Sequence, residues 1–253
     1  MKIAVTGKGG VGKTTVAAIL ARLYAEEGRS VVAADVDPDA NLGLALGFTE
    51  AEIDAITPIS HMTEFINERT GSDTSGIGKF FKINPKVDDI PERFAKVKNG
   101  VRLLVLGTVD TAGSGCVCPE HVLLKRLLSH LVLREDDVVI MDMEAGLEHL
   151  ARGTTDFMDR FIVVVEPGAR SVQTYESVKR LATELGVKRV DAIANKVRNP
   201  DDEAYLRKRV PNLLGVIPYN TAVIDADRAG ISPFDAGGEV VEILRGVKKI
   251  IDA

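Results

Sequence analysis

A glycine-rich loop near the N-terminus is the feature that most constrains how this chain folds. The apolar stretch Lys2–Thr6 runs directly into Gly-Lys-Gly-Gly-Val-Gly-Lys-Thr-Thr at residues 7–15, and the amphipathic stretch Thr14–Glu27 follows. The spacing G-x-x-x-x-G-K-[ST] between a strand and a helix is typical of a loop that binds phosphate. Its glycines let successive backbone N–H groups face an anion, and the N-terminus of the next helix adds partial positive charge. The sequence therefore predicts a strand, a phosphate-binding loop and a helix as the first unit of the fold.

The same loop indicates that the ligand is a nucleoside triphosphate bound with Mg²⁺. The Lys13 side chain is expected to reach the β and γ phosphates, and the Thr14 hydroxyl is expected to bind the metal ion. The residues predicted to contact the nucleotide here are Gly9, Gly10, Val11, Gly12, Lys13, Thr14 and Thr15.

The rest of the chain alternates short apolar runs with amphipathic stretches, which indicates a doubly wound α/β fold. We expect a single, mainly parallel sheet flanked by helices, with ligands at the carboxyl ends of its strands. No low-complexity linker or fixed-period repeat divides residues 1–253, so we predict one domain. We interpret Thr70–Gly100 as an insertion on the rim of the sheet, with Phe80–Ile83 as a candidate short strand. The predicted strands are Lys2–Thr6, Ser30–Asp35, Arg102–Leu106, Asp137–Asp142, Phe161–Glu166, Val190–Asn195 and Leu213–Ile217, and the predicted helices are Thr14–Glu27, Pro119–Leu133, Ser171–Leu185 and Glu239–Ile251.

The additional lysine of the loop, Lys8, points to a particular superfamily. The sequence Lys-Gly-Gly-Val-Gly-Lys-Thr at residues 8–14 resembles the deviant Walker A motif of the MinD/ParA, nitrogenase iron protein and arsenite-pump ATPases. The resemblance implies an ATPase in which this lysine crosses the interface of a homodimer and contacts the partner's nucleotide. Lys8 would there neutralise charge that develops on the phosphates, so Lys8 and Lys13 are predicted catalytic residues.

Two aspartates match further parts of this superfamily's site. The run Ala-Asp-Val-Asp-Pro-Asp at residues 34–39 resembles the first switch, in which the residue matching Asp37 orients the attacking water. A carboxylate near the γ phosphate accepts a hydrogen bond from that water without being a strong base. Asp142 ends another predicted strand and is expected to hold Mg²⁺ through water. Asp35 and Asp39 are interpreted as solvated or capping residues.

The base is indicated by Asn195 and Lys196, which close a predicted strand where this superfamily places residues that recognise the base. Guanine needs a carboxylate acceptor, which GTPases supply two residues after the lysine. Here that position is Arg198, which only donates hydrogen bonds, so adenine is favoured. Pro218 and Tyr219 follow the next predicted strand and would either line the base or pack in a turn.

The two cysteines of the chain, Cys116 and Cys118, are separated by one residue. A disulfide between them would close a strained ring, so we do not expect a structural disulfide. Pro119 fits the first position of a helix, which makes Cys118 its N-cap residue, and the helix dipole there would lower the pKa of the thiol. Two thiolates that face one way are half of a soft-metal site, and the same pair on a second subunit would complete it. The alternative is two small half-buried residues in a turn, and His121 is a weaker candidate ligand.

Taken together, these motifs resemble those of CooC-type proteins over nearly the full length of the chain. The residues that carry the resemblance are 8–14, 37–39, 116–120 and 142–154. Such proteins are ATPases that insert nickel during maturation of carbon monoxide dehydrogenase, with relatives that serve acetyl-CoA synthase. The resemblance implies a nucleotide-dependent homodimer that binds one Ni²⁺ or Zn²⁺ through the paired cysteines. Glu144 stands where glycine is typical of these proteins, and His121 stands where an aromatic residue is typical.

Charge and composition disfavour several other functions. The net charge of −5 argues against broad binding of nucleic acid. No apolar run approaches the ~18 residues of a membrane span, and the N-terminus has no signal-peptide pattern. The amphipathic tail Glu239–Ala253 has balanced charges, unlike a helix that binds anionic lipid. We therefore expect a cytoplasmic protein with no nucleic-acid partner and no stable membrane association.

Three related functions remain to be compared with that of an ATPase that carries and inserts nickel. Ala145–Arg152 contains no cysteine, which argues against an iron–sulfur protein that transfers electrons. Arg198 and the lack of a histidine-rich tract argue against a GTP-dependent nickel chaperone. The alternative that we retain is a positioning ATPase of the MinD/ParA type, which acts on a membrane or DNA without a metal cargo.

Overall fold

A single sheet organises the chain. The computed structural model describes residues 1–37, 40–72, 81–107, 118–133, 137–144, 158–187 and 189–253. The strands in these residues are β1 (Lys2–Gly7), β2 (Val31–Asp35), β3 (Lys96–Lys98), β4 (Val101–Val105), β5 (Val138–Asp142), β6 (Arg160–Val165), β7 (Val190–Val197) and β8 (Leu213–Pro218). They form one 8-stranded sheet in the order β3-β4-β2-β5-β1-β6-β7-β8. Every neighbouring pair is parallel except β3 and β4, so the predicted doubly wound, mainly parallel sheet is confirmed.

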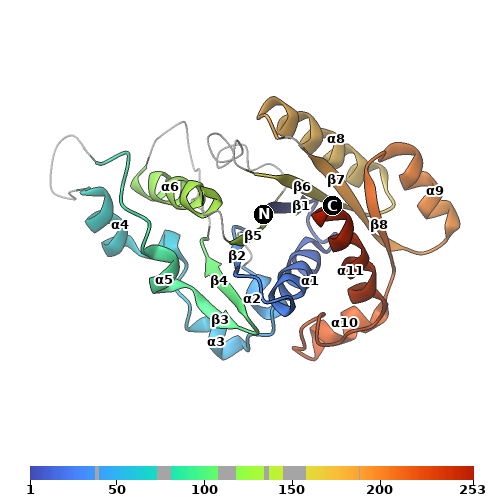
Figure 1. The fold of residues 1–253 in the computed structure, drawn as a ribbon, viewed down its shortest axis with the longest axis horizontal. Coiled ribbons are helices and arrows are strands. Elements are labelled where there is room, and N and C mark those ends of the chain that lie inside the picture. Colours follow the sequence, from blue (N-terminus) through green and yellow to red (C-terminus); the bar gives the residue numbers. More distant parts are fainter. Residues whose placement is uncertain (38–39, 73–80, 108–117, 134–136, 145–157, 188) are drawn as a thin grey trace.

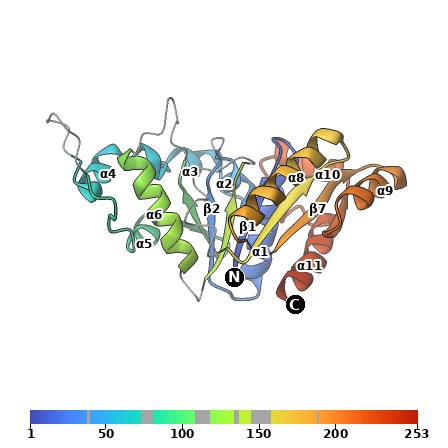
Figure 2. The same cartoon turned by 90° about the horizontal axis from the view of Figure 1, so that it is seen from above.

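Helices cover both faces of this sheet. The described helices are α1 (Lys13–Glu26), α2 (Leu42–Ala45), α3 (Glu50–Asp54), η1 (Ile59–His61, a 3₁₀ turn), α4 (Thr63–Thr70), α5 (Ile90–Phe94), α6 (Pro119–Leu133), α8 (Ala169–Glu184), α9 (Pro200–Arg209), α10 (Thr221–Arg228) and α11 (Glu239–Asp252). Helices α6 and α8 lie on one face, and α1 and α11 lie on the other (Figure 1, Figure 2). All residues of β1, β2, β5 and β6 are buried, which explains why the middle of each strand is apolar on both faces instead of alternating.

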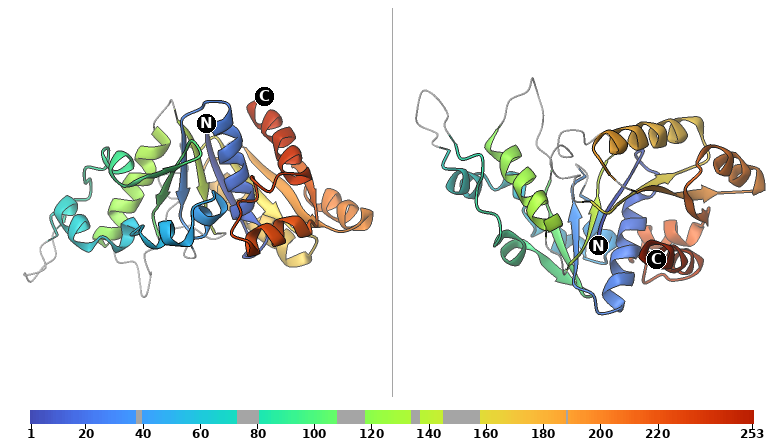
Figure 3. Two further views of the ribbon diagram at one scale, coloured as in Figure 1. Left: turned by 90° about the horizontal axis from the view of Figure 1, so that it is seen from below. Right: turned by 45° about the horizontal axis from the view of Figure 1, so that its top comes forward.

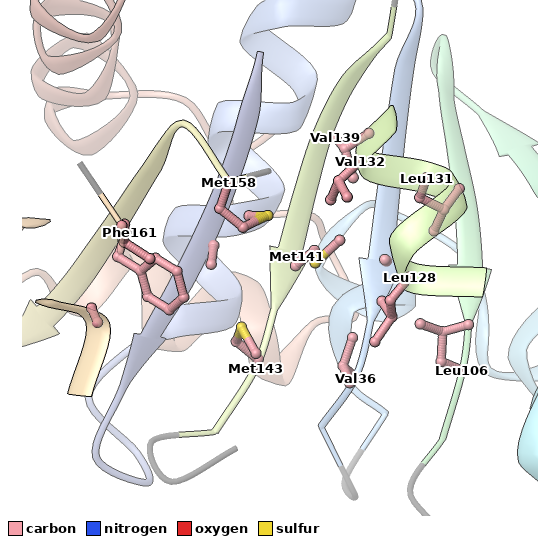
Figure 4. Packing of buried hydrophobic residues seen from close by; sticks show 14 of the residues in the cluster. Val36, Leu106, Leu128, Leu131, Val132, Val139, Met141, Met143, Met158 and Phe161 are labelled. Carbon is pink, nitrogen blue, oxygen red and sulfur yellow. The ribbon is translucent and has the colours of Figure 1, made fainter. Parts of the chain in front are cut away.

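The core on the α6 face is built from side chains of that helix and of the strands beneath it. Leu128, Leu131 and Val132 of α6 pack toward Val139 and Met141 of β5 (Figure 4). These three helix positions recur at three- and four-residue spacing, so one stripe of α6 is apolar and faces the sheet.

On the opposite face, α1 and α11 lie side by side (Figure 3). The Lys248 ammonium of α11 donates to Glu27 at 2.6 Å and to Asp252 at 2.7 Å, and the Tyr24 hydroxyl of α1 donates to Asp252 at 2.8 Å. The amphipathic tail predicted from the sequence therefore packs its apolar side against the sheet and α1. None of the described helices is long and apolar enough to cross a membrane.

The predicted strands and long helices are all present, with ends that differ by at most two residues. The candidate strand at Phe80–Ile83 was wrong: residues 81–83 form no strand, and Phe80 lies outside the described residues. The extra strand is instead β3, which pairs antiparallel with β4. It turns back through Asn99 (φ 52°) and Gly100 (φ 77°), and an Asn-Gly pair with both φ values positive is the signature of a two-residue hairpin.

Several shorter helices were not predicted from the sequence. They are α2, α3, α4, α5, α9 and α10. Stretches of one to three turns repeat the helical period too few times for an apolar stripe to be recognised.

Candidate nucleotide-binding site

The phosphate loop connects β1 to α1 at the carboxyl end of the sheet. Strand β1 ends at Gly7, and α1 begins at Lys13 with Gly12 as its N-cap residue. Gly10 (φ 75°) and Gly12 (φ 96°) have left-handed backbone conformations, which residues with a Cβ rarely adopt. A Cβ on Gly12 would also collide with the side-chain amide of Asn195. None of the described side chains caps α1, so its first N–H groups are available to an anion.

Lys13 lies in the first turn of α1 together with Thr14 and Thr15. Its ammonium forms an ion pair with the Asp37 carboxylate at 3.2 Å, and both side chains are almost completely buried. The two residues that we predict to act on the γ phosphate are thus brought together, although 24 positions separate them in the sequence.

Asp142 ends β5 and is 1% exposed. Neither of its carboxylate oxygens has a hydrogen-bond partner at ordinary distance among the described residues. Burial raises the pKa of Asp142 to about 6, against the opposite effects of the nearby Thr14 hydroxyl and Lys13 ammonium. A buried carboxylate with unused acceptor oxygens beside a threonine hydroxyl fits Mg²⁺, which prefers oxygen ligands.

Asp35 was interpreted from the sequence as either a solvated or a capping residue, and the structure contradicts the first of these. It is not solvated, because the residue has no exposed surface. Its carboxylate accepts hydrogen bonds from the Leu42 N–H at 2.9 Å and the Asp37 N–H at 3.2 Å, which agrees with a capping role at the turn after β2. Burial, followed by the repulsion of Asp142, raises the pKa of Asp35 to about 7. The second interpreted residue, Asp39, lies outside the described residues.

Lys8 stands at the rim of the loop. Its ammonium lies 3.4 Å from the Glu166 carboxylate, and 40% of the lysine side chain is exposed. Glu166 follows β6, and its own N–H donates to the Ser171 hydroxyl at 3.0 Å. The partly exposed Lys8 is held within its own subunit by this pair.

The residues predicted to recognise the base lie at the ends of β7 and β8. The Asn195 amide donates to the Val11 carbonyl at 2.8 Å, so it contacts the phosphate loop directly. Pro218 ends β8 and is half-buried. Next to it, the exposed Tyr219 ring is covered by the Arg198 guanidinium, 5.0 Å from the ring centroid.

Cys118 lies immediately before α6, and its carbonyl accepts the N–H of Val122 at 3.1 Å. This is the N-cap position expected from Pro119, and the Cys118 side chain is half-buried. The expected drop in thiol pKa is not found: burial raises the pKa of Cys118, although the His121 N–H acts in the opposite direction. Cys116 lies outside the described residues, among which no group of three or more His, Cys, Asp or Glu side chains could hold a metal ion.

Comparisons with known proteins agree with this geometry. The family described as the CobQ/CobB/MinD/ParA nucleotide binding domain matches residues 2–234. The chain belongs to this family. It is a P-loop ATPase of the MinD/ParA type, as the deviant loop predicted.

Within the family, this MinD/ParA-type chain is similar to a CooC protein. It is 48% identical over 237 residues to the carbon monoxide dehydrogenase accessory protein CooC of Rhodospirillum rubrum, which covers 93% of this chain and 90% of that protein. An uncharacterized ATP-binding protein of Methanocaldococcus jannaschii is 45% identical over 234 residues, with coverage of 91% and 90%. The predicted resemblance to CooC-type proteins is confirmed, and the chain is a CooC-like accessory protein.

Solved structures share the MinD/ParA fold at low identity. A Borrelia burgdorferi plasmid partition protein bound to AMPPNP superposes with a TM-score of 0.69 at 18% identity, covering 99% of this chain and 98% of that one. The Pyrococcus horikoshii MinD complexed with Mg-ADP has a TM-score of 0.61 at 24% identity, with coverage of 99% and 94%. These neighbours support the fold of the nucleotide-binding domain.

Glu166 of this MinD/ParA-type site was not assigned a role from the sequence, and the contact of Lys196 with the phosphate loop was not predicted. Glu166 pairs with Lys8, Lys196 contacts the phosphate loop, and Asp35 holds the turn that carries Asp37. The capping interpretation of Asp35 came from the sequence itself, because an aspartate at a strand end followed by Val-Asp-Pro is typical of a side chain that caps a turn.

Proposed function

We propose that the chain is an ATP-hydrolysing metallochaperone that forms a nucleotide-dependent homodimer, carries Ni²⁺ or Zn²⁺ on Cys116 and Cys118, and assists nickel insertion into carbon monoxide dehydrogenase or acetyl-CoA synthase. The observation that carries the proposal is the 48% identity, over 93% of this chain, to a carbon monoxide dehydrogenase accessory protein. The Cys-x-Cys pair adds the chemistry that a nickel or zinc cargo requires.

ATP binding replaces the internal ion pair of Lys13. This ammonium is 3.2 Å from the Asp37 carboxylate, and both side chains are buried. A triphosphate bound to the loop offers Lys13 several negative oxygens, so Lys13 moves to the β and γ phosphates and Asp37 is left to accept a hydrogen bond from the attacking water. The helix N-terminus and the loop N–H groups hold the phosphates in line.

Thr14 and Asp142 are the residues that would hold Mg²⁺, with the Asp142 carboxylate acting through water. Bound there, the ion would neutralise negative charge on the triphosphate. The buried oxygens of Asp142 support this assignment, since none of the described residues places a donor at ordinary hydrogen-bond distance from them.

Lys8 links hydrolysis to dimerisation. The side chain is partly exposed at the rim of the loop, as a residue that crosses a subunit interface must be. When two copies meet face to face, Lys8 exchanges the Glu166 carboxylate for the phosphates of the partner's nucleotide. The more highly charged phosphates favour that exchange.

The cargo site is formed by both subunits. Cys118 precedes α6, and a twofold axis that brings two Cys116/Cys118 pairs together supplies four thiolates, enough to close a tetrahedral or square-planar shell. Because burial raises the pKa of the Cys118 thiol, metal binding must release its proton, and the affinity for the metal should fall at acidic pH.

The test is a titration of Ni²⁺ and Zn²⁺ into the apo, ADP-bound and ATP-bound chain, with the oligomeric state measured at each point. We expect one ion per dimer in the parent and none in the Cys116→Ser/Cys118→Ser variant. The His121→Ala variant is the matched control and should keep that stoichiometry. Equal stoichiometry in the parent and the double variant would overturn the metal cargo and favour a positioning ATPase. A preference for GTP over ATP would overturn the nucleotide assignment.

A further inference from the structure

The end of strand β7 reaches the phosphate loop from two strands away. Asn195 Nδ2 donates to the backbone oxygen of Val11 at 2.8 Å, and Lys196 Nζ donates to the backbone oxygen of Gly10 at 2.6 Å. Two consecutive side chains of β7 therefore hold two consecutive carbonyls of the loop.

Neighbouring residues of a regular strand point to opposite faces of the sheet, so this double contact requires irregular backbone. Lys196 has a φ of 59°, in the left-handed region that residues with a Cβ seldom occupy. The pairing of β7 with β8 also shifts register between Ala194 and Val197. These two departures let both side chains reach the same loop. Backbone of this kind persists where the surrounding structure holds it, and it clusters at functional sites.

Holding the carbonyls has a consequence for the N–H groups. The peptide unit is planar and trans, so a carbonyl turned toward β7 directs the N–H of the next residue the other way. The Gly10 carbonyl shares its peptide unit with the Val11 N–H, and the Val11 carbonyl shares its unit with the Gly12 N–H. The Val11 N–H donates to the Lys8 carbonyl at 3.3 Å, whereas planarity directs the Gly12 N–H away from β7, as a loop that binds an anion through its backbone N–H groups requires.

The same contacts also orient the Asn195 side chain. Its Oδ1 already accepts the N–H of Lys196 at 2.9 Å, and its Nδ2 packs against Gly12. The amide is oriented by the protein backbone at both ends.

We propose that Asn195 and Lys196 form a loop clamp, which positions the phosphate loop for the triphosphate chain, and that Lys196 acts on phosphate affinity without reading the base. The loop clamp rests on the phosphate-binding role of this loop in the proposed function. Lys196 is a positioning residue in this account, since it acts through the Gly10 carbonyl.

The experiment measures the affinity of the full-length chain for Mg·ATP, Mg·GTP and Mg·tripolyphosphate, the last by competition against ATP. Lys196→Gly removes the side chain and suits the left-handed backbone, whereas Lys196→Met keeps the aliphatic stem and removes the charge. Lys196→Arg is the conservative variant. Lys249→Met, at an exposed position of α11, is the matched control for the loss of one positive charge.

We expect Lys196→Gly and Lys196→Met to weaken ATP and tripolyphosphate by the same factor, about tenfold for one charge-assisted hydrogen bond. The ratio of ATP to GTP affinity should not change, KM should rise more than kcat falls, and Lys196→Arg should recover part of the affinity. Unchanged tripolyphosphate affinity in both variants, or a loss confined to ATP, would overturn the loop clamp. A parent chain that binds no ATP would instead overturn the proposed function itself, so the two failures are distinguishable.

Discussion

Replacing Asp142 with asparagine should stabilise the ligand-free chain while it abolishes Mg²⁺-dependent hydrolysis. The carboxylate is 1% exposed and has no hydrogen-bond donor at ordinary distance among the described residues. The position of its negative charge suits a bound cation. Without a cation, the buried charge lowers the free energy of unfolding. Asparagine has nearly the same shape and no charge.

The pKa of Asp142 gives the magnitude and the sign of this change in stability. Burial raises this pKa from 3.8 to about 6, which corresponds to a penalty of about 3 kcal/mol when the group is ionised in the folded chain. Because the folded state holds the proton more tightly than the unfolded state, the penalty is absent below pH 3.8 and complete once the pH has risen past 6. At pH 8 the asparagine variant should therefore unfold at a temperature roughly 6 to 12 °C higher than the parent.

The assay is urea denaturation of both proteins at pH 4 and pH 8, with a chelator present and without nucleotide. The difference in free energy of unfolding should be small at pH 4 and reach about 3 kcal/mol at pH 8. Asp225→Asn is the control, because that carboxylate is exposed beside Arg228 and should contribute little at either pH. The reasoning is refuted by an Asp142 variant that is less stable than the parent at pH 8, or by a gain that is equal at both pH values.

Three further outcomes are expected. Glu166→Gln frees Lys8 from its 3.4 Å ion pair and should tighten the ATP-dependent dimer in sedimentation velocity. The expected gain is about fivefold, from two exposed ion pairs of roughly 0.5 kcal/mol each, and a weaker dimer would contradict this. Lys13→Ala removes the 3.2 Å ion pair of the buried Asp37 carboxylate and should lower the free energy of unfolding by about 3 kcal/mol in urea denaturation. The Lys13→Ala/Asp37→Ala double variant should recover part of that loss, and losses that simply add would contradict an interaction between the two residues. Gly12→Ala, at φ 96° against a neighbouring amide, should destabilise the fold by about 1–3 kcal/mol and abolish ATP binding in calorimetry; full binding would show that the loop accepts a Cβ.

Local patterns in the sequence were enough to predict the first unit of the fold and the start of α6. The glycines of residues 7–12 specify their own backbone conformations, and Pro119 begins a helix because its missing N–H has no partner at that position. The apolar strands were recognisable because burial on both faces of a parallel sheet removes the alternation of polar residues. Each of these signals comes from interactions within a few residues.

The contacts that complete the candidate site depend on strand order instead. Lys8 meets Glu166 because β6 lies beside β1, and Lys196 meets Gly10 because β7 is the next strand after β6, although about 160 to 190 positions separate these pairs in the sequence. Asp35 is buried because β2 lies between β4 and β5, a neighbourhood that no local pattern reveals. Sequence periodicity predicted the buried strands and the long helices, and the glycine motif predicted the phosphate loop. Which side chain reaches which backbone oxygen, and which carboxylate loses its water, was decided only by tertiary packing, since both depend on groups that the chain brings together from distant positions.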